Sequence, residues 1–476
     1  MATLQDLGLT LGNVDLGEIE AEADPKLAEY FVTTDFVVDA IEGTASLFLG
    51  RKGSGKSAVF TQLPRLIRES GKPEVISIQL TPDNYSWAAL RRYEEQGLLA
   101  EHAHTNAWKY SLVIEIAANL VGSGHAWSPA AEKGISELKS FLGANYGPGQ
   151  STFGTSATSL IKGLQNLNLS AFGFGVGVER AAPAEVPITP AVTRALLERM
   201  DEAFKEASVV VVLDRLDDSW DASPESHSLL VGLLKAARDL TNTYGNRGPT
   251  GLRVLTFLRS DIYDNLRFDD KDKQRGTERL LTWSAAQLGT MLTLRLPTGM
   301  SADELFEQGD PMRGGITPFN YIVKRTFLRP REILQFTGLC IQQAGKASAV
   351  VSKENIRQAE ERYSSWKVDD LKQEYRKATP HFERLVECLR EGVHRYDAID
   401  DLNAVVALKE PGIVEDLGTR RVLEILFEAS VIGVRARDSG SLRFRSEDSN
   451  LILPAAGAVY VHQGLYKGLR IHEARA

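Results

Sequence analysis

The sequence predicts an α/β fold in which a parallel sheet carries helices on both faces. Two observations support this prediction. A compact apolar run at residues 45–49 enters a glycine-rich turn and then a stretch with helical spacing at 56–69, and a second apolar run at 208–213 ends at an acidic residue. Around them, strand-like and helix-like segments alternate, which is the pattern of parallel α/β proteins.

The composition is that of an ordinary globular protein. The 476 residues are 43% hydrophobic and 25% charged, and a chain of this length has roughly two or three domains. No apolar stretch approaches the ~20 residues of a membrane span, and residues 1–16 lack the basic segment of a secretory signal.

Charge and cysteine content narrow the class further. The two isolated cysteines, Cys340 and Cys388, and the scattered histidines indicate neither a disulfide framework nor a zinc site, so we expect a cytoplasmic protein. The net charge of −8 indicates that any contact with DNA depends on a local basic patch.

The remaining elements follow from the same periodicities. Helices are expected at residues 108–121, 189–207, 226–244, 319–344, 353–376 and 420–429, and strands at 75–80, 252–258, 431–436 and 442–444. The last helix and the two strands after it have the layout of a winged helix. Residues 122–188 are expected to be an insertion with a helix and a glycine-rich ribbon at 169–178. That ribbon either packs on the core or serves subunit or partner contact.

The segment Gly50-Arg51-Lys52-Gly53-Ser54-Gly55-Lys56-Ser57 is a complete phosphate-binding loop pattern (P-loop, Walker A) between a predicted strand and a predicted helix. Glycines let backbone N–H groups approach phosphate oxygens, Lys56 is expected to reach the β- and γ-phosphates, and the Ser57 hydroxyl is expected to ligate Mg²⁺. The helix that begins at Lys56 directs its positive end at the anion. The pattern therefore predicts a site for ATP or GTP with Mg²⁺. The expected nucleotide-binding residues are Gly50, Gly53, Ser54, Gly55, Lys56, Ser57 and Ala58.

Asp214 follows the buried strand at 208–213 and is expected to organise the Mg²⁺ ion beside the loop. Many hydrolysing P-loop enzymes have a second carboxylate directly after this one, but Arg215 stands there. We expect either Asp217 or Asp218 to orient the attacking water instead. The alternative for either residue is to cap the next element.

Arg259 ends the predicted strand at 252–258, at the edge where parallel sheets bind ligands. It is expected to sense the γ-phosphate or to stabilise transition-state charge. The alternative is an ion pair with Asp214 or Asp217.

Further arginines lie later in the chain. Arg329 and Arg331 flank Pro330, which is expected to open a helix; they either reach the nucleotide from a helical subdomain or form a solvated basic helix start. Arg275 and Arg279 either act on the nucleotide of a neighbouring subunit or lie in a solvated loop.

Four segments occur in the order GRKGSGKS, VVVVLDRLDD, FLRSDIY and LRPREIL, before the winged-helix-like segment. Together they resemble a bacterial P-loop ATPase family near the AAA+/STAND grouping, which includes origin-recognition-type initiators and KAP-type NTPases. The resemblance covers residues 25–345 and, more loosely, 380–471. It implies an NTPase core with the strand order of the additional-strand P-loop class, an α-helical lid, and nucleotide-dependent assembly or switching.

The resemblance also implies roles for single residues. It assigns Lys56 and Ser57 to phosphate and Mg²⁺, Asp214 to Mg²⁺, Arg259 to a strand-end sensor and either Arg329 or Arg331 to a lid sensor, and it favours ATP over GTP. The domains expected are a lead-in at 1–44, the ATPase core at 45–296 with its insertion at 122–188, the helical lid at 297–376 and the winged-helix-like domain at 377–476.

The function expected is that of a slowly hydrolysing ATPase that acts as an assembly switch. It would form homo-oligomers and regulate a protein partner or effector, and the resemblance places such proteins in stress or anti-phage defence. The alternative is a DNA-binding ATPase of the initiator or loader type, with Arg435, Arg437, Arg443 and Arg445 of the hairpin on DNA phosphates. Glu424 and Glu428 on the preceding helix disfavour that alternative, because they would face the DNA.

Overall fold

The computed structural model describes most of the chain, in two units. The described residues are 2–71, 75–81, 100–146, 190–218, 220–245, 248–309, 311–436 and 440–472. The sheet unit comprises Thr33–Arg51 and Lys56–Leu281, and the C-terminal unit comprises Met1–Val32, Lys52–Gly55 and Thr282–Ala476. Among helices in the described ranges, none combines the length and the apolar character that crossing a bilayer requires.

The sheet unit is built on a five-stranded parallel sheet with the order β2-β3-β4-β1-β5. The strands are β1 (Leu47–Leu49), β2 (Val75–Leu80), β3 (Ser208–Leu213), β4 (Gly251–Leu258) and β5 (Glu278–Leu280). Strand β4 pairs with both β1 and β3, so one strand lies between the loop-bearing strand and the strand that ends at Asp214. This is the order of the additional-strand class, and it confirms the predicted α/β core.

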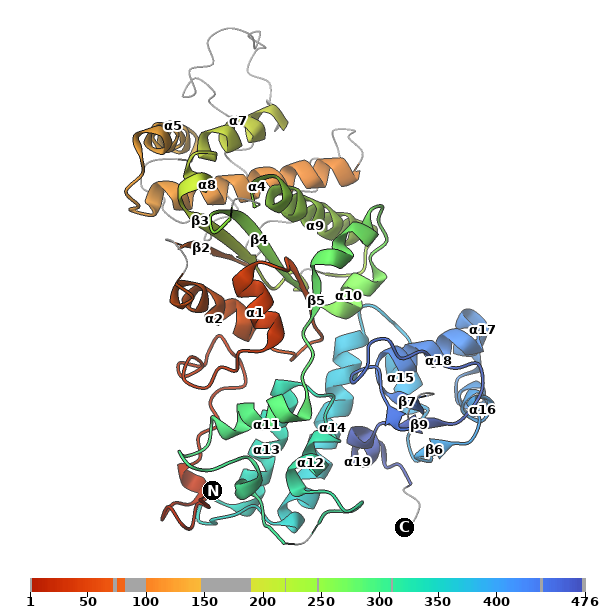
Figure 1. Ribbon diagram of the computed structural model, residues 1–476. Helices are drawn as coiled ribbons and strands as arrows, with labels where there is room; N and C mark the ends of the chain where they lie inside the picture. Colours follow the sequence, from red (N-terminus) through yellow and green to blue (C-terminus); the bar gives the residue numbers. More distant parts are fainter. Residues whose placement is uncertain are drawn as a thin grey trace. The chain divides into compact units, whose positions relative to one another are not determined.

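Helices cover both faces of this sheet (Figure 1). Helices α4 (Ala100–Gly122) and α9 (Pro224–Tyr244) lie on one face, and α1 (Asp35–Glu42) and α2 (Lys56–Glu69) lie on the other. Every residue of β3 is buried, which explains its unbroken apolar sequence.

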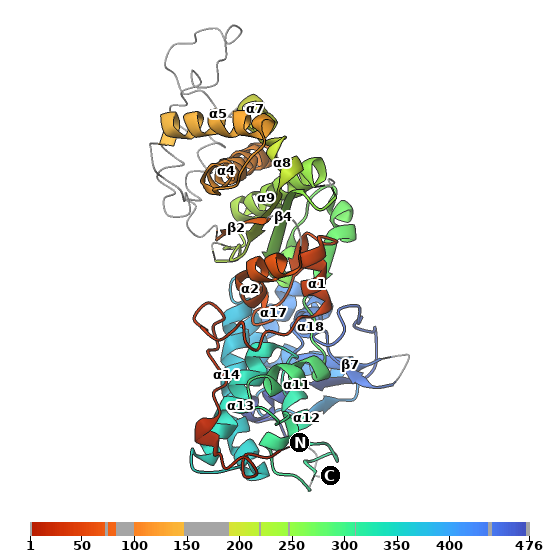
Figure 2. The same cartoon turned by 60° about the vertical axis from the view of Figure 1, so that its left-hand side comes forward.

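A second layer of helices packs on α4, on the side away from the sheet (Figure 2). It contains α5 (Pro129–Tyr146) and α7 (Pro190–Met200), followed by the short α8 (Ala203–Glu206). The helix predicted at 189–207 is therefore two helices separated by a turn. The glycine-rich ribbon predicted at 169–178 lies outside the described residues. The short α10 (Ser260–Asn265) follows β4.

In the C-terminal unit, four helices surround a core to which the N-terminal segment adds Leu4 and Leu11. They are α11 (Ala285–Thr293), α12 (Pro318–Val323), α13 (Pro330–Ala344) and α14 (Lys353–Tyr375). The helix predicted at 319–344 is broken in two, because Pro330 cannot continue a helix and Leu328 has a left-handed φ of 53°.

The end of the chain forms a second core with an antiparallel sheet of order β6-β9-β7-β8. Its elements are α15 (Phe382–Glu387), β6 (Arg395–Tyr396), α16 (Ile399–Lys409), α17 (Pro411–Leu417), α18 (Thr419–Glu428), β7 (Ile432–Arg435), β8 (Leu442–Arg443), β9 (Val459–Val461) and α19 (Tyr466–Leu469). Helix α18 precedes the β7–β8 hairpin in the order that the sequence predicts. The winged-helix assignment and the domain boundaries remain predictions.

Candidate nucleotide-binding site

The glycine-rich loop leaves β1 and enters α2 at Lys56. Its first residue is fixed to the neighbouring strand, because Gly50 N–H donates to the Leu258 carbonyl at 3.1 Å. Gly53 and Gly55 have φ values of 80° and 98°, in the left-handed region that glycine adopts without a steric penalty. The loop therefore needs glycine at both positions to keep its shape.

Lys56 is buried, with 9% of its surface exposed. Its Nζ donates to the carbonyl oxygens of Gly50 at 3.0 Å and Arg51 at 3.2 Å. Burial lowers the pKa of Lys56, while Asp217 and Asp214 oppose that shift. Two neutral carbonyls are modest partners for a buried ammonium, and a phosphate oxygen would form a stronger, charge-assisted bond.

Ser57 and Asp214 meet although they are 157 residues apart, with Ser57 Oγ donating to Asp214 Oδ2 at 2.8 Å. The backbone N–H of Asp214 donates to the Leu80 carbonyl, which fixes the end of β3. Burial raises the pKa of Asp214, while Lys56 and the Ser57 hydrogen bond oppose that rise. A hydroxyl and a carboxylate are the oxygen ligands that Mg²⁺ prefers.

The residues present fit a nucleotide with Mg²⁺. Besides the Ser57–Asp214 pair, the buried Oγ of Ser54 has no hydrogen-bond partner within the described part of the chain. Buried hydroxyls usually have a partner, and a ligand in the loop would supply one. In the sheet unit, Lys56, Ser57 and Asp214 are the residues that would contact the phosphates and the ion.

We expect Asp214→Asn to abolish most Mg²⁺-dependent phosphate release, by about a hundredfold, because an amide cannot provide the anionic ligand. The Ser57 bond is retained, so the unfolding temperature should stay close to that of the wild type.

The pKa of Asp214 is raised in the wild type, so its carboxylate takes up a proton at a higher pH than an ordinary aspartate does. We therefore expect the affinity for Mg²⁺ to fall at that higher pH. Mg²⁺ titrations at several acidic pH values measure this, and an equal pH dependence in Asp214→Asn would contradict it.

The turn after Asp214 holds the predicted water-orienting residues. Arg215, at the position of the usual second carboxylate, is exposed and has a φ of 59°, which is uncommon for a residue other than glycine. Asp217 is partly buried and Asp218 is exposed. The next helix, α9, is capped by Ser223, whose side chain accepts from Ser226 N–H, and so neither aspartate is its cap.

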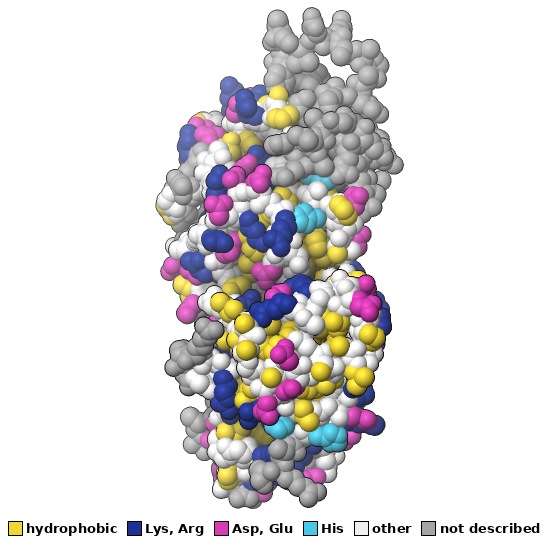
Figure 3. All heavy atoms as spheres, turned by 90° about the vertical axis from the view of Figure 1, so that its right-hand side faces the viewer, with side chains coloured by type: hydrophobic (Ala, Val, Ile, Leu, Met, Phe, Trp, Pro, Cys, Tyr) yellow, Lys and Arg dark blue, Asp and Glu magenta, His cyan; other side chains and the backbone are white. Residues whose placement is uncertain are grey.

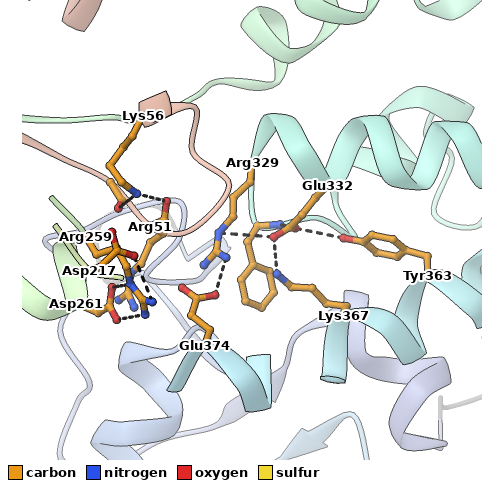
Figure 4. A network of polar contacts seen from close by, with 12 residues as sticks. Arg51, Lys56, Asp217, Arg259, Asp261, Arg329, Glu332, Tyr363, Lys367 and Glu374 are labelled. Carbon is orange, nitrogen blue, oxygen red and sulfur yellow. Dashed lines mark hydrogen bonds and ion pairs between the residues drawn. The ribbon is translucent and has the colours of Figure 1, made fainter. Parts of the chain in front are cut away.

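Arg259 is held by two carboxylates at the end of β4 (Figure 4). It donates to Asp261 through Nε at 3.2 Å and Nη2 at 2.6 Å, and its Nη1 lies 3.8 Å from Asp217 Oδ2. The ion pair with Asp217 that the sequence offered as an alternative is therefore present. The closer partner, Asp261, was missed, although an acid two residues after an arginine was a signal for it.

Arg329 is neither solvated nor free in the C-terminal unit. Only 7% of its surface is exposed, and its guanidinium lies 2.9 Å from Glu374 and 3.6 Å from Glu332. Burial alone lowers the pKa of Arg329, but Glu374 and Glu332 outweigh burial and raise it. Arg331 is partly buried, and a Cβ built on Gly53, in the same unit, would lie 3.3 Å from Arg331 Cβ.

Glu332 is the centre of a buried polar cluster that the sequence analysis did not identify (Figure 4). Its carboxylate accepts from Phe327 N–H at 2.6 Å and from the Tyr363 hydroxyl at 3.2 Å, and it forms an ion pair with Lys367. Two cations, Arg329 and Lys367, thus balance Glu332 and Glu374. This cluster fixes the segment before α13 against α14.

The sheet order, the loop and the Ser57–Asp214 pair define a P-loop α/β core. Residues 286–372 match the family of the FunZ-associated C-terminal helical domain, a range that overlaps the predicted lid. The chain is 22% identical over 469 residues to the "Putative transposon gamma-delta 80.3 kDa protein" of Escherichia coli (strain K12), covering 92% of this chain and 64% of that relative. The chain thus spans less than two thirds of that relative's length.

Among solved structures, the chain resembles Cdc6p from Pyrobaculum aerophilum. The TM-score is 0.29 and the identity 10%, with 92% of this chain and 89% of the other covered. Because that score is low, the fold assignment rests on the strand order and the loop alone.

Proposed function

We propose that this chain is a slowly hydrolysing, Mg²⁺-dependent ATPase whose nucleotide state controls its assembly with copies of itself and with a protein partner or effector. The main support is the hydrogen bond between Ser57 and Asp214, which joins the two expected Mg²⁺ ligands beside Lys56. When bound, Mg²⁺ supplies charge stabilisation at the phosphates. The proposed choice of ATP and the proposed setting, bacterial stress or anti-phage defence, rest on the family resemblance.

Slow ATP hydrolysis is proposed because of the residues in the turn after β3. Arg215 replaces the second carboxylate, and Asp217 lies 3.8 Å from Arg259, so that its charge is partly engaged. Either Asp217 or Asp218 is proposed to orient water, with Arg259 as the strand-end sensor. Arg329 or Arg331 is proposed as the lid sensor. If Arg329 has this role, its buried ion pairs with Glu332 and Glu374 would have to exchange a carboxylate for a phosphate.

Two arginines in and just before β5 are candidates for a contact between copies of the chain in an assembly. Arg279 pairs with Asp39 of α1 at 2.6 Å, whereas Arg275 is exposed in the 3-10 helix Lys271–Thr277. Of the two arginines, Arg275 is therefore the better candidate for acting on the nucleotide of a neighbouring copy.

We expect Arg275→Ala to lower phosphate release by about tenfold or more without weakening ATP binding, since one charge-assisted contact in the transition state is lost. The sharper test mixes Arg275→Ala with Lys56→Ala protein. Arg275→Ala retains the nucleotide site and Lys56→Ala retains the arginine, so mixed oligomers should release phosphate faster than either variant alone. Activity that is unchanged in Arg275→Ala would remove this residue from the proposal.

The hairpin arginines give less support to the DNA-binding alternative. Arg435 donates to Tyr460 Oη and to the Gly440 carbonyl, and Arg445 to the Leu451 carbonyl, while Arg443 lies 3.8 Å from Asp448. Arg437 lies outside the described residues. On the face drawn in Figure 3, basic and acidic side chains are interspersed, whereas a DNA-binding surface concentrates basic ones.

Two measurements separate these functions. Phosphate release and molecular mass in solution, each with and without Mg·ATP, test the assembly switch. A salt-sensitive shift of duplex DNA that is lost in Arg443→Ala/Arg445→Ala would favour the DNA-binding ATPase instead.

A further inference from the structure

Trp283 contacts the crest of the phosphate-binding loop, which we define as residues Lys52–Gly55. Its indole Nε1–H donates to the Ser54 carbonyl oxygen at 2.9 Å. A Cβ built on Gly55 would lie 3.8 Å from Trp283 Cζ2. All of these residues belong to the C-terminal unit.

The tryptophan ring is itself anchored. It is partly buried and packs against the core that contains Leu288 and Met291 of α11. Ser284, the next residue, caps α11 through a capping box with Gln287, which fixes the backbone beside Trp283. The indole N–H that donates to the loop therefore has a fixed position.

This hydrogen bond determines where an important N–H group points. The Ser54 carbonyl and the Gly55 N–H belong to one planar peptide group, and in the trans form they point in opposite directions. The described chain has no cis peptide bonds. Holding the carbonyl on Trp283 thus turns the Gly55 N–H to the opposite side, away from the indole.

The loop needs such a constraint at this point. Gly55 has a φ of 98°, and a glycine offers little steric resistance to rotation of the peptide before it. A rotated peptide would present a carbonyl, rather than an N–H, to an incoming phosphate, which is repulsive.

We infer that Trp283 is a positioning residue, which holds the Ser54–Gly55 peptide so that its N–H is ready for the β-phosphate of a bound nucleotide. This inference rests on the proposed nucleotide-binding function and gives it a residue that the loop pattern does not contain. The occupant is a nucleoside di- or triphosphate, because a monophosphate has no β-phosphate for that N–H to bind.

Calorimetric titration of Trp283→Phe tests the role, since phenylalanine keeps an aromatic ring and lacks the N–H. We expect its affinity for ADP and ATP to fall by about three- to tenfold, the usual effect of one hydrogen bond, and its affinity for AMP to stay unchanged. Trp366→Phe is the matched control, because Trp366 is an exposed tryptophan on α14 in the same unit, and it should bind all three nucleotides as the wild type does.

A spectroscopic readout separates positioning from simple packing. The chain has six tryptophans. The Trp283 indole N–H resonance is assigned by its absence in Trp283→Phe, or in Trp283→Tyr if the phenylalanine variant is unstable. In the wild type, this resonance should shift on addition of ADP and stay in place with AMP.

The outcomes are distinct. A wild type that binds no ATP would overturn the proposed function itself. If the wild type binds ATP and Trp283→Phe binds ADP and ATP as tightly as the wild type does, only the role of Trp283 is overturned. If Trp283→Phe is too unstable to titrate, the wild-type resonance decides: a shift with ADP supports the role, and no shift contradicts it.

Discussion

Lys56→Ala is expected to show no ATP binding at micromolar protein concentrations and to lower phosphate release by at least about a hundredfold. The buried ammonium is the charge that the loop offers to the phosphates, and its two carbonyl partners, Gly50 and Arg51, cannot replace it. Calorimetry with Mg·ATP measures binding, and a coupled assay measures phosphate release.

Lys52→Ala is the matched control for that variant. Lys52 lies in the same loop, at a position that the phosphate-binding pattern leaves open. Its replacement should leave ATP binding within about threefold of the wild type, as expected for an outlying charge. Equal losses in the two lysine variants would indicate a general electrostatic effect and would contradict the specific role of Lys56.

Glu332→Gln is expected to destabilise the protein by about 3–5 kcal/mol, the usual effect of removing one partner of a buried ion pair. The change removes the ion-pair partner of Lys367 and leaves Glu374 as the paired carboxylate of Arg329. It also weakens the acceptor for Phe327 N–H. Chemical denaturation of the purified variant measures the free energy of unfolding.

The pH dependence of this variant provides a second check. Burial lowers the pKa of Lys367, and Glu332 opposes that shift. Without Glu332 the folded-state pKa falls further, so the unfolded chain binds the extra proton between that value and 10.5. The Lys367 pKa of the folded wild type also lies below 10.5, but less far below it. The stability of Glu332→Gln should therefore rise relative to the wild type as the pH increases from the Lys367 pKa of the folded variant to that of the folded wild type, and the two should rise together above it.

Two further variants test the assignment to the buried ion pair. Glu361→Gln, at an exposed position on α14, should change the stability by less than about 0.5 kcal/mol. Adding Lys367→Met to Glu332→Gln should recover part of the loss, because the unpaired buried cation is removed. A loss in Glu332→Gln no larger than that in Glu361→Gln would show that the cluster contributes little.

The phosphate-binding loop and the sheet were predictable because their signals are local. Glycine spacing, the lysine after it and the apolar run of β3 each occupy fewer than a dozen residues, and each has a direct physical meaning. The place of Asp214 beside Ser57 followed from the rule that parallel strands end at one edge.

The partners of the arginines were not predictable in the same way. Glu374 is 45 residues from Arg329, and Ser54 is 229 residues from Trp283, so both contacts depend on how helices pack. Strand β6 has two residues, too few to give an alternating pattern. The break at Leu328 depends on a left-handed backbone that leucine rarely adopts, and so no sequence rule indicated it.

Light scattering tests most directly whether nucleotide binding at Lys56 controls assembly. The molecular mass of the wild type and of Lys56→Ala is measured with and without Mg·ATP, while phosphate release is assayed in the same samples. We predict that ATP changes the mass of the wild type, that Lys56→Ala keeps one mass in both conditions, and that phosphate release is slow. Hydrolysis by a wild type whose mass is the same with and without ATP would contradict the assembly switch.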